Sequence, residues 1–203
     1  TCYKHYFDCY LSSQSSKESC LPTGTLSLIK KSVFTMGNIW PTDTITEDAH
    51  LGVEMISRNL KIGFTNTQIG KGVMPTTIDD YVKQYKRWVF GNFQTYIKML
   101  FSKNINLKEK IQLSTLLTAW LNLLGFTFLI CFLILPIAII LGFDTKTILI
   151  LSTINITTHI AIQLFIFLKL SKFKTKESLK GLLIHLSTIG IGSFYWMQYF
   201  LKS

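Results

Sequence analysis

The sequence predicts an α/β segment followed by an α-helical transmembrane bundle of about three helices. Hydrophobic residues make up 48% of the chain, and the mean hydropathy is +0.34. Charge is unevenly divided, because residues 1–110 contain 14 Lys or Arg and 9 Asp or Glu, whereas residues 111–203 contain 7 and 2. In the first half, strand-like runs alternate with helical ones. We therefore expect the end of an α/β domain at 1–77, an amphipathic interfacial helix with its linker at 78–110, and a transmembrane region at 111–203.

Two strands and one helix are expected before residue 78. Leu26–Ile29 is short and apolar, as in a buried strand, and residues 61–66 alternate enough to form a second strand. Between them, Thr44 or Thr46 can cap a helix over 47–59. Two acidic residues in the first turn of that helix suit the positive end of its dipole.

The helix expected over 78–101 has two distinct faces. Gln84, Arg87, Trp88 and Gly91 recur at i, i+3, i+4 and i+7, so an amide, a guanidinium, an indole and a gap share one side. Arginine is rare here, with two against 19 lysines, so its presence on this face is notable. An interfacial helix with guanidinium and indole at the level of lipid headgroups is a second, compatible interpretation. The other face is an apolar stripe of Ile78, Tyr81, Tyr85, Val89 and Phe93.

Three apolar stretches in the second half have the length of membrane spans, at about 118–142, 147–170 and 182–200. The lysines before the first span and in the loop 169–180 predict, by the positive-inside rule, that this loop and residues 1–110 are cytoplasmic. The expected location is therefore the plasma (inner) membrane, with the lipid bilayer as a partner. His159, inside the second stretch, fits either a proton relay or a polar residue packed within the bundle.

The net charge of +10 raises the question of nucleic acid, but many lysines flank apolar stretches and suit anionic headgroups better, so we expect no nucleic-acid partner. Cys2, Cys9, Cys20 and Cys131 form no CxxC pair and are interpreted as reduced thiols, with a disulfide among the first three as the alternative. The chain has no initiator Met and opens in mid-pattern at Thr1, so we expect it to be a fragment.

Three short motifs occur in a fixed order. Thr23–Thr25 precedes a Lys30-Lys31 pair, Thr46–Asp48 reads Thr-Glu-Asp, and Gln84–Trp88 reads Gln-x-x-Arg-Trp. Together with the apolar tail they resemble membrane-embedded processive family 2 glycosyltransferases of the cellulose synthase, hyaluronan synthase and bacterial β-glucan synthase type. The resemblance covers about residues 7–200. The chain departs from the family pattern in the first motif, where Thr replaces Cys and two lysines replace two arginines, which weakens the acceptor role of that segment.

The resemblance implies an inverting hexosyltransferase, which moves a sugar from a UDP-sugar donor to a growing polysaccharide at the cytoplasmic membrane face, with translocation of the product as a further step. Asp48 would be the general base that takes the proton of the attacking hydroxyl, a role worth roughly 10²–10⁴-fold in rate. Arg87 would bind the donor diphosphate, because a planar guanidinium suits bidentate contacts. The resemblance assigns acceptor contacts to Trp88, Gln84, Thr23, Gly24 and Thr25, and supporting roles to Glu47, Thr46 and His50.

The family also requires Mg²⁺ or Mn²⁺ on the diphosphate, held by a D-x-D motif. This chain contains no D-x-D, and its Asp79-Asp80 pair is better interpreted as a helix-capping feature. The metal ligands are therefore expected in a missing N-terminal half, and the fragment alone is expected to be inactive. Phe173–Lys176 weakly resembles the family's gating segment, although a basic anchor loop is the favoured interpretation. An accessory export subunit is a further expected partner.

Two alternatives stay open at this point. A non-processive enzyme would transfer a single sugar to a glycolipid acceptor, and product analysis would separate it from a polymerase. A non-enzymatic transporter or scaffold subunit would keep its function after Asp48→Asn, whereas an enzyme would lose it.

Overall fold

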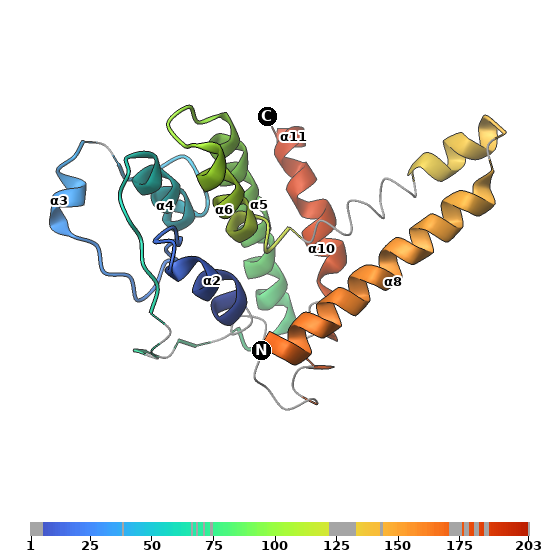
Figure 1. The fold of residues 1–203 in the computed structure, drawn as a ribbon, viewed down its shortest axis with the longest axis horizontal. Coiled ribbons are helices and arrows are strands. Elements are labelled where there is room, and N and C mark those ends of the chain that lie inside the picture. Colours follow the sequence, from blue (N-terminus) through green and yellow to red (C-terminus); the bar gives the residue numbers. More distant parts are fainter. Residues whose placement is uncertain are drawn as a thin grey trace. The chain divides into compact units, whose positions relative to one another are not determined.

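The computed structural model describes residues 6–37, 39–65, 67, 69–70, 72–73, 75–121, 133–142, 144–170, 176, 179–180, 183–184 and 187–202. The described chain is helical (Figure 1). Its named elements are η1 Tyr6–Leu11, α2 Ser12–Ser15, α3 Lys31–Phe34, α4 Glu47–Ser57, α5 Ile78–Phe101, α6 Leu107–Leu117, α8 Thr145–Leu170, α10 Ile189–Phe194, η2 Tyr195–Met197 and α11 Gln198–Lys202.

The chain divides into two compact units. One, called here the motif unit, comprises Tyr6–Leu121 with Tyr195–Ser203 and contains all three sequence motifs. The other comprises Asn122–Phe194 with Thr1–His5. The boundaries predicted at residues 77 and 110 stay a prediction.

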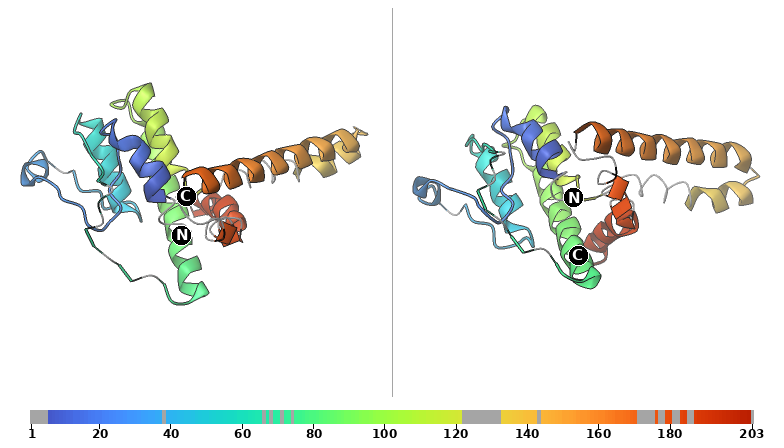
Figure 2. Two further views of the ribbon diagram at one scale, coloured as in Figure 1. Left: turned by 60° about the horizontal axis from the view of Figure 1, so that its bottom comes forward. Right: turned by 90° about the horizontal axis from the view of Figure 1, so that it is seen from below.

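The motif unit is organised around α5. Both α4 and α6 lie alongside this helix (Figures 1 and 2), and η2 and α11 contact it as well. One apolar cluster of the described residues joins η1, α4, α5 and α6, and burial of such side chains contributes about 1.5–3 kcal/mol each. Its fully buried members include Leu11, Met99, Leu113, Leu116 and Leu117.

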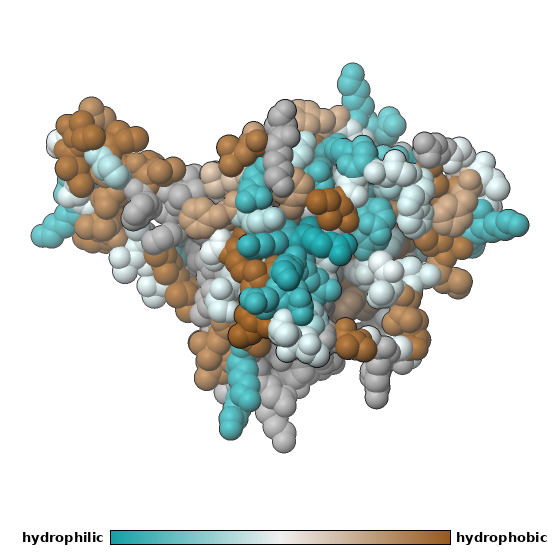
Figure 3. All heavy atoms as spheres, turned by 180° about the vertical axis from the view of Figure 1, so that it is seen from behind, coloured by the Kyte–Doolittle hydropathy of each residue, from teal (hydrophilic) through white to brown (hydrophobic). Residues whose placement is uncertain are grey.

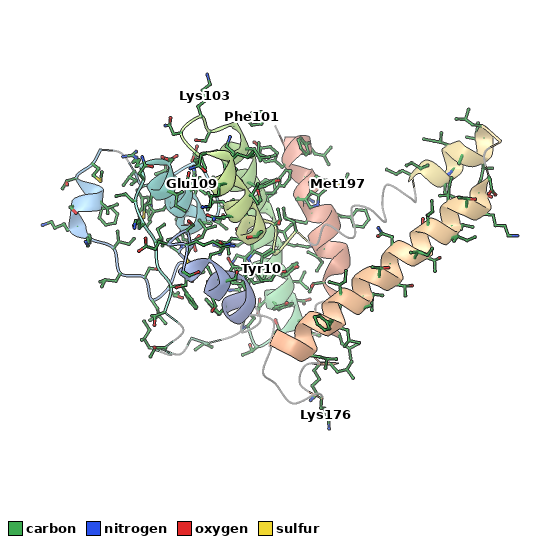
Figure 4. The ribbon with its side chains drawn as sticks, viewed as in Figure 1. Tyr10, Phe101, Lys103, Glu109, Lys176 and Met197 are labelled. Atoms are coloured by element: carbon green, nitrogen blue, oxygen red, sulfur yellow. The ribbon has the colours of Figure 1, made fainter. Side chains whose placement is uncertain are left out.

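The helix predicted over 78–101 is confirmed with the same bounds. Thr77 caps it by accepting a hydrogen bond from the Asp80 amide at 3.1 Å, as expected for a capping residue. The next helix, α6, begins with a capping box, in which Asn106 and Glu109 bond each other's backbone amides at 2.9 and 3.2 Å. Lys103 extends outward from the loop between the two helices (Figure 4), away from this packed interior.

The helix predicted over 47–59 is observed as α4, but its cap differs from the prediction. Thr46 occupies the N-cap position, yet its side chain makes no capping hydrogen bond. Its hydroxyl is buried instead, and no partner for it occurs among the described residues. The hydroxyl is therefore placed by packing rather than by the helix end.

The predicted α/β fold is wrong in the described part of the chain, because no strand forms there and a single isolated parallel bridge joins Ser19 to Ile62. The segment Leu26–Ile29 is not a buried strand, since the side chains of Leu26 and Leu28 are 64% and 103% exposed. Residues 61–66 contribute only the bridge at Ile62, with residue 66 outside the described residues. A strand needs a neighbour to pair its backbone groups, and of these two segments only residues 61–66 find one, at the bridge from Ile62 to Ser19.

The predicted transmembrane bundle is also contradicted. Among the helices formed by the described residues, none combines the length and the apolar character needed to cross a bilayer. In the first predicted span the described helical residues are 133–140 only, with residues 122–132 undescribed, and the third is divided among α10, η2 and α11. The same finding contradicts the multi-pass plasma-membrane location predicted for this chain, with 1–110 and 169–180 as its cytoplasmic parts.

Several expectations fall outside the described residues. They concern Cys2, Cys131, the side chains of Cys9 and His159, and the segment Phe173–Thr175. Cys20 is described, and it is a free, buried thiol whose pKa is raised to about 11 by burial.

In the second unit, residues 133–140 and α8 are joined by a tight turn. Gly142 adopts a positive φ of 71°, and Asp144 accepts hydrogen bonds from the amides of Lys146 and Thr147 at 3.0 and 3.3 Å. Hydrophobic side chains gather over this end of the unit (Figure 3), where Ile140 is 82% exposed.

Candidate active site

The loop before α4 is attached along one side of α5. We call residues Asp43–Thr46 the strap. Asp43 forms an ion pair with Lys98 of α5. Two residues on, the amide of Ile45 donates a hydrogen bond to Gln94 Oε1 at 3.2 Å. These contacts fix the strap against α5 at two successive positions.

A third contact brings the backbones of strap and helix together. A Cβ atom built on Gly91 would lie 2.6 Å from Thr46 Cγ2, 2.7 Å from its Oγ1 and 2.8 Å from its backbone nitrogen. Carbon atoms in ordinary contact lie about 3.5–4.0 Å apart. Only glycine therefore permits this approach, and it joins the Gln-x-x-Arg-Trp helix to the Thr-Glu-Asp motif.

The three contacts set the direction of the chain. Lys98, Gln94 and Gly91 lie on one face of α5, and Arg87 continues that face one turn earlier. As residue numbers rise along the strap, the numbers of its partners on α5 fall, so the two segments run antiparallel. Continuing in this direction, the chain reaches Asp48 as α5 reaches Arg87.

The electrostatics of Asp48 agree with this register. Its carboxyl is half-buried, and burial is the largest influence on its pKa, which is raised above 3.8. The negative charge of Glu47 raises it further, while the amide of Ala49 and the positive charge of Arg87 oppose the rise. Burial therefore makes this carboxylate more basic than a solvated one.

The two oxygens of Asp48 differ in their surroundings. Oδ1 accepts a hydrogen bond from the Ala49 amide at 2.8 Å. Oδ2 faces Gly24, where an added Cβ would lie 3.1 Å from this oxygen. Gly24 has a φ of +75°, a conformation that glycine adopts without strain. The absent side chain leaves room beside one carboxylate oxygen.

A second close approach places Gly24 there. A Cβ on Gly52 would lie 2.6 Å from Pro22 Cδ and 2.7 Å from Leu21 Cδ2. Gly52 is one turn after Asp48 on α4, so the segment 21–24 crosses α4 at the glycine and continues toward the carboxylate. The first and second sequence motifs thus meet at Asp48.

His50 lies on another side of α4. Its Nδ1 is 3.2 Å from the Thr44 hydroxyl and 3.5 Å from Asp43, and its Nε2 is 3.7 Å from Glu54. Burial is the largest influence on its pKa, which is lowered, with Lys98 acting in the same direction and the two carboxylates opposing it. His50 thus supports the strap and makes no recorded contact with Asp48.

Trp88 is half-buried and packs against Trp120, with ring centroids 4.8 Å apart. Trp120 also contacts Tyr6, at 4.7 Å between centroids. The buried hydroxyl of Tyr6 has a raised pKa, first because of burial and then because of the negative charge of Asp48. Aromatic rings therefore extend from Trp88 to the neighbourhood of the carboxylate.

The structure brings Thr46, Asp48, Gly24 and Arg87 together. Glu47 is exposed and acts on Asp48 through its charge. The remaining expected site residues are Thr23, Thr25 and Gln84, whose acceptor roles stay predictions, as do the catalytic roles of the whole set.

Sequence reasoning missed several residues that shape this site. Gln94 and Lys98 extend the predicted face of α5 by two turns, so continuing the helical count beyond Gly91 would have found them. Gly52 carried no motif signal. Trp120 was assigned to a membrane span, which hid its place beside Trp88.

The described residues do not fit a metal site, because no group of three or more His, Cys, Asp or Glu lies close enough there to hold an ion. Mg²⁺ or Mn²⁺, with ligands elsewhere, stays a prediction, and no step below depends on it.

Comparison with known proteins settles the family. The family model described as glycosyl transferase family group 2 matches residues 1–169. The chain belongs to this family. No curated protein and no solved structure matches it. The family confirms the predicted family 2 glycosyltransferase and its activity as a transferase of glycosyl groups, while the cellulose synthase-like processive subtype stays a prediction.

Proposed function

We propose that the motif unit carries the acceptor-activating half of an inverting hexosyl transfer from a nucleotide sugar to a saccharide hydroxyl. The observation that carries this proposal is the antiparallel register between the strap and α5, which sets the half-buried carboxylate of Asp48 beside Arg87 and under Gly24. The Asp48 carboxylate, the Arg87 guanidinium and the space beside Gly24 are thus close to one another, as transfer to a hydroxyl requires.

In the proposed reaction, the acceptor hydroxyl enters beside Gly24 and donates a hydrogen bond to Asp48 Oδ2. As its oxygen attacks the anomeric carbon of the donor, the O–H proton passes to the carboxylate. The bond from the anomeric carbon to the diphosphate breaks, and the nucleoside diphosphate leaves with the electron pair. Inversion follows because the nucleophile and the leaving group occupy opposite sides of that carbon.

Arg87 offsets the charge that grows on the departing diphosphate. Its side chain is exposed, so a ligand can reach it. A guanidinium can form two parallel hydrogen bonds to a phosphate, whereas a lysine ammonium acts as a point charge. Trp88 presents an indole face one residue on, and such faces suit the apolar C–H side of a sugar ring.

The test is Asp48→Asn in the purified full-length protein, which includes the metal-binding half that this chain is expected to need, assayed for UDP release and for transfer of labelled sugar in the presence of Mg²⁺ or Mn²⁺. The donors are UDP-glucose, UDP-galactose and UDP-N-acetylglucosamine, and the acceptors are cellotriose and chitotriose. Loss of the base should lower kcat by roughly 10²–10⁴-fold. Asp79→Asn is the matched control, since it removes an exposed carboxylate from the start of α5.

Two outcomes oppose the proposal. Wild-type activity in the Asp48→Asn variant would exclude this carboxylate as the base. Equal losses in both aspartate variants would point to net charge instead of base chemistry. Product length, measured on the same reactions, separates a polymerase from an enzyme that transfers a single sugar.

A further inference from the structure

We propose that Trp120 is a positioning residue that holds the indole of Trp88 in one orientation for the acceptor sugar. This inference rests on the acceptor role of Trp88 in the function proposed above. Neither the motifs nor the family match assigns a role to Trp120, which lies in the turn after α6.

Trp120 is fixed from several directions within the motif unit. Its ring lies 4.8 Å from the Trp88 ring and 4.7 Å from the Tyr6 ring, measured between centroids, with tilts of 52° and 36°. Tyr85 meets the same ring edge-on at 6.1 Å. The indole of Trp120 therefore contacts three aromatic rings, which restrict its orientation.

The backbone at this position is held as well. The Tyr85 hydroxyl donates a hydrogen bond to the Trp120 carbonyl at 3.1 Å. Tyr85 is buried on α5, three residues before Trp88, so the helix that carries Trp88 also anchors Trp120. A substitution of Trp120 should thus alter the orientation of the Trp88 side chain before that of other site residues.

The need for such a support follows from the exposure of Trp88. A half-buried indole on a helix can adopt other rotamers, and ordering it on binding costs free energy that a preformed orientation avoids. Aromatic pairs also contribute more than the burial of their apolar area alone. Removing the pair should therefore weaken acceptor binding while leaving the proton transfer at Asp48 largely unchanged.

The same helix offers a matched control on a different side. Trp196 packs against Phe93 of α5 with ring centroids 4.9 Å apart. Trp196→Leu thus removes an indole with a similar contact to α5, yet away from Trp88. Both tryptophans belong to the motif unit.

The first experiment reads the contact without any substrate. Two indoles at this separation couple their electronic transitions and give a paired band in the far-ultraviolet circular dichroism spectrum. Trp88→Phe and Trp120→Phe should each remove the same band, whereas Trp196→Phe should leave it. Different spectral changes in the first two variants would overturn the packing on which the proposal depends.

The second experiment measures kinetics with the donor and the trisaccharide selected by the screen above. Trp120→Leu should raise the acceptor KM about tenfold and change kcat less than twofold, while Trp120→Phe, which keeps a ring, should stay within about threefold of wild type. Trp196→Leu should leave the acceptor KM unchanged. An unchanged KM in Trp120→Leu, beside a raised one in Trp88→Ala, would refute the positioning role alone. An unchanged KM in Trp88→Ala would instead remove the proposed acceptor role of Trp88, and the spectral test would still judge the contact.

Discussion

Replacing Gly91 by Ala tests the register of the strap directly. The added methyl would enter the contact with Thr46, where three atoms lie within 2.6–2.8 Å of its position. One of the three is the backbone nitrogen, so a side-chain rotation cannot relieve the overlap. Since α5 is a long, continuous helix, the strap is the part that we expect to yield.

The size of the effect follows from these distances. Ordinary contact begins at 3.4 Å, so the backbone nitrogen must retreat by about 0.6 Å from its 2.8 Å position. A displacement of about 1 Å can cost on the order of 10²-fold in rate. We therefore expect kcat to fall about tenfold. Stability should change less, because a gain of about 1 kcal/mol from replacing a helical glycine opposes an overpacking cost of about 1–3 kcal/mol.

The assay combines turnover with thermal unfolding followed by circular dichroism. Gly190→Ala is the matched control, since Gly190 also lies in a helix, α10, but a Cβ there meets no atom within 4 Å. This control should keep its full turnover. If Gly91→Ala gained stability and kept wild-type activity, the close approach between α5 and the strap would be wrong, and with it the placement of Asp48.

Two further predictions concern the base and the helix below it. Because burial raises the pKa of Asp48, the acid limb of the kcat/KM profile should lie above pH 3.8; a limb at or below that value would show a solvated carboxylate. Because the pKa of Asp48 is raised in the folded state, the neutral carboxyl stabilises the fold below the pKa of the unfolded state, and this stabilisation is lost as the pH rises through the pKa of the folded state. Asp48→Asn, which stays neutral, should therefore unfold at a higher temperature than wild type at pH 7 and not at pH 3. Asn106→Ala should remove the capping box of α6 and lower the free energy of unfolding by about 1 kcal/mol, with turnover unchanged at 25 °C, whereas Asn106→Asp should retain most of that stability.

The helices were predictable because their signals are local. The bounds of α5 follow from Thr77 and the two aspartates at its start, and from an apolar stripe of which Tyr85, Val89 and Phe93 are buried. Propensity, capping and periodicity act here in the same direction, and none of them depends on distant residues.

The strands and the membrane spans were predicted wrongly for a shared reason. A short apolar run such as Leu26–Ile29 predicts that its side chains will be buried, but it does not identify the residues that will pack against them. In the described chain Leu26 and Leu28 stay exposed, Ile29 packs against a small cluster of buried side chains, and the segment forms no strand. Likewise, apolar composition alone predicted three spans, whereas Trp120, counted in the first of them, packs beside Tyr6 and Trp88 in the motif unit.

The site itself shows which features a motif search can find. Charged and aromatic residues such as Asp48 and Arg87 are visible in sequence because their chemistry is distinctive. Their positions, however, are set by contacts at Gly24, Gly52 and Gly91, where neighbouring atoms come within 2.6–3.1 Å of the place a Cβ would take. At Gly52 the nearest atom is Pro22 Cδ, which the proline ring bonds to the backbone, and at Gly91 one is a backbone nitrogen, so alanine should disturb the site at both positions. A series of alanine variants that instead ranked by helix propensity would mean that the motif residues reach their places by some other contact.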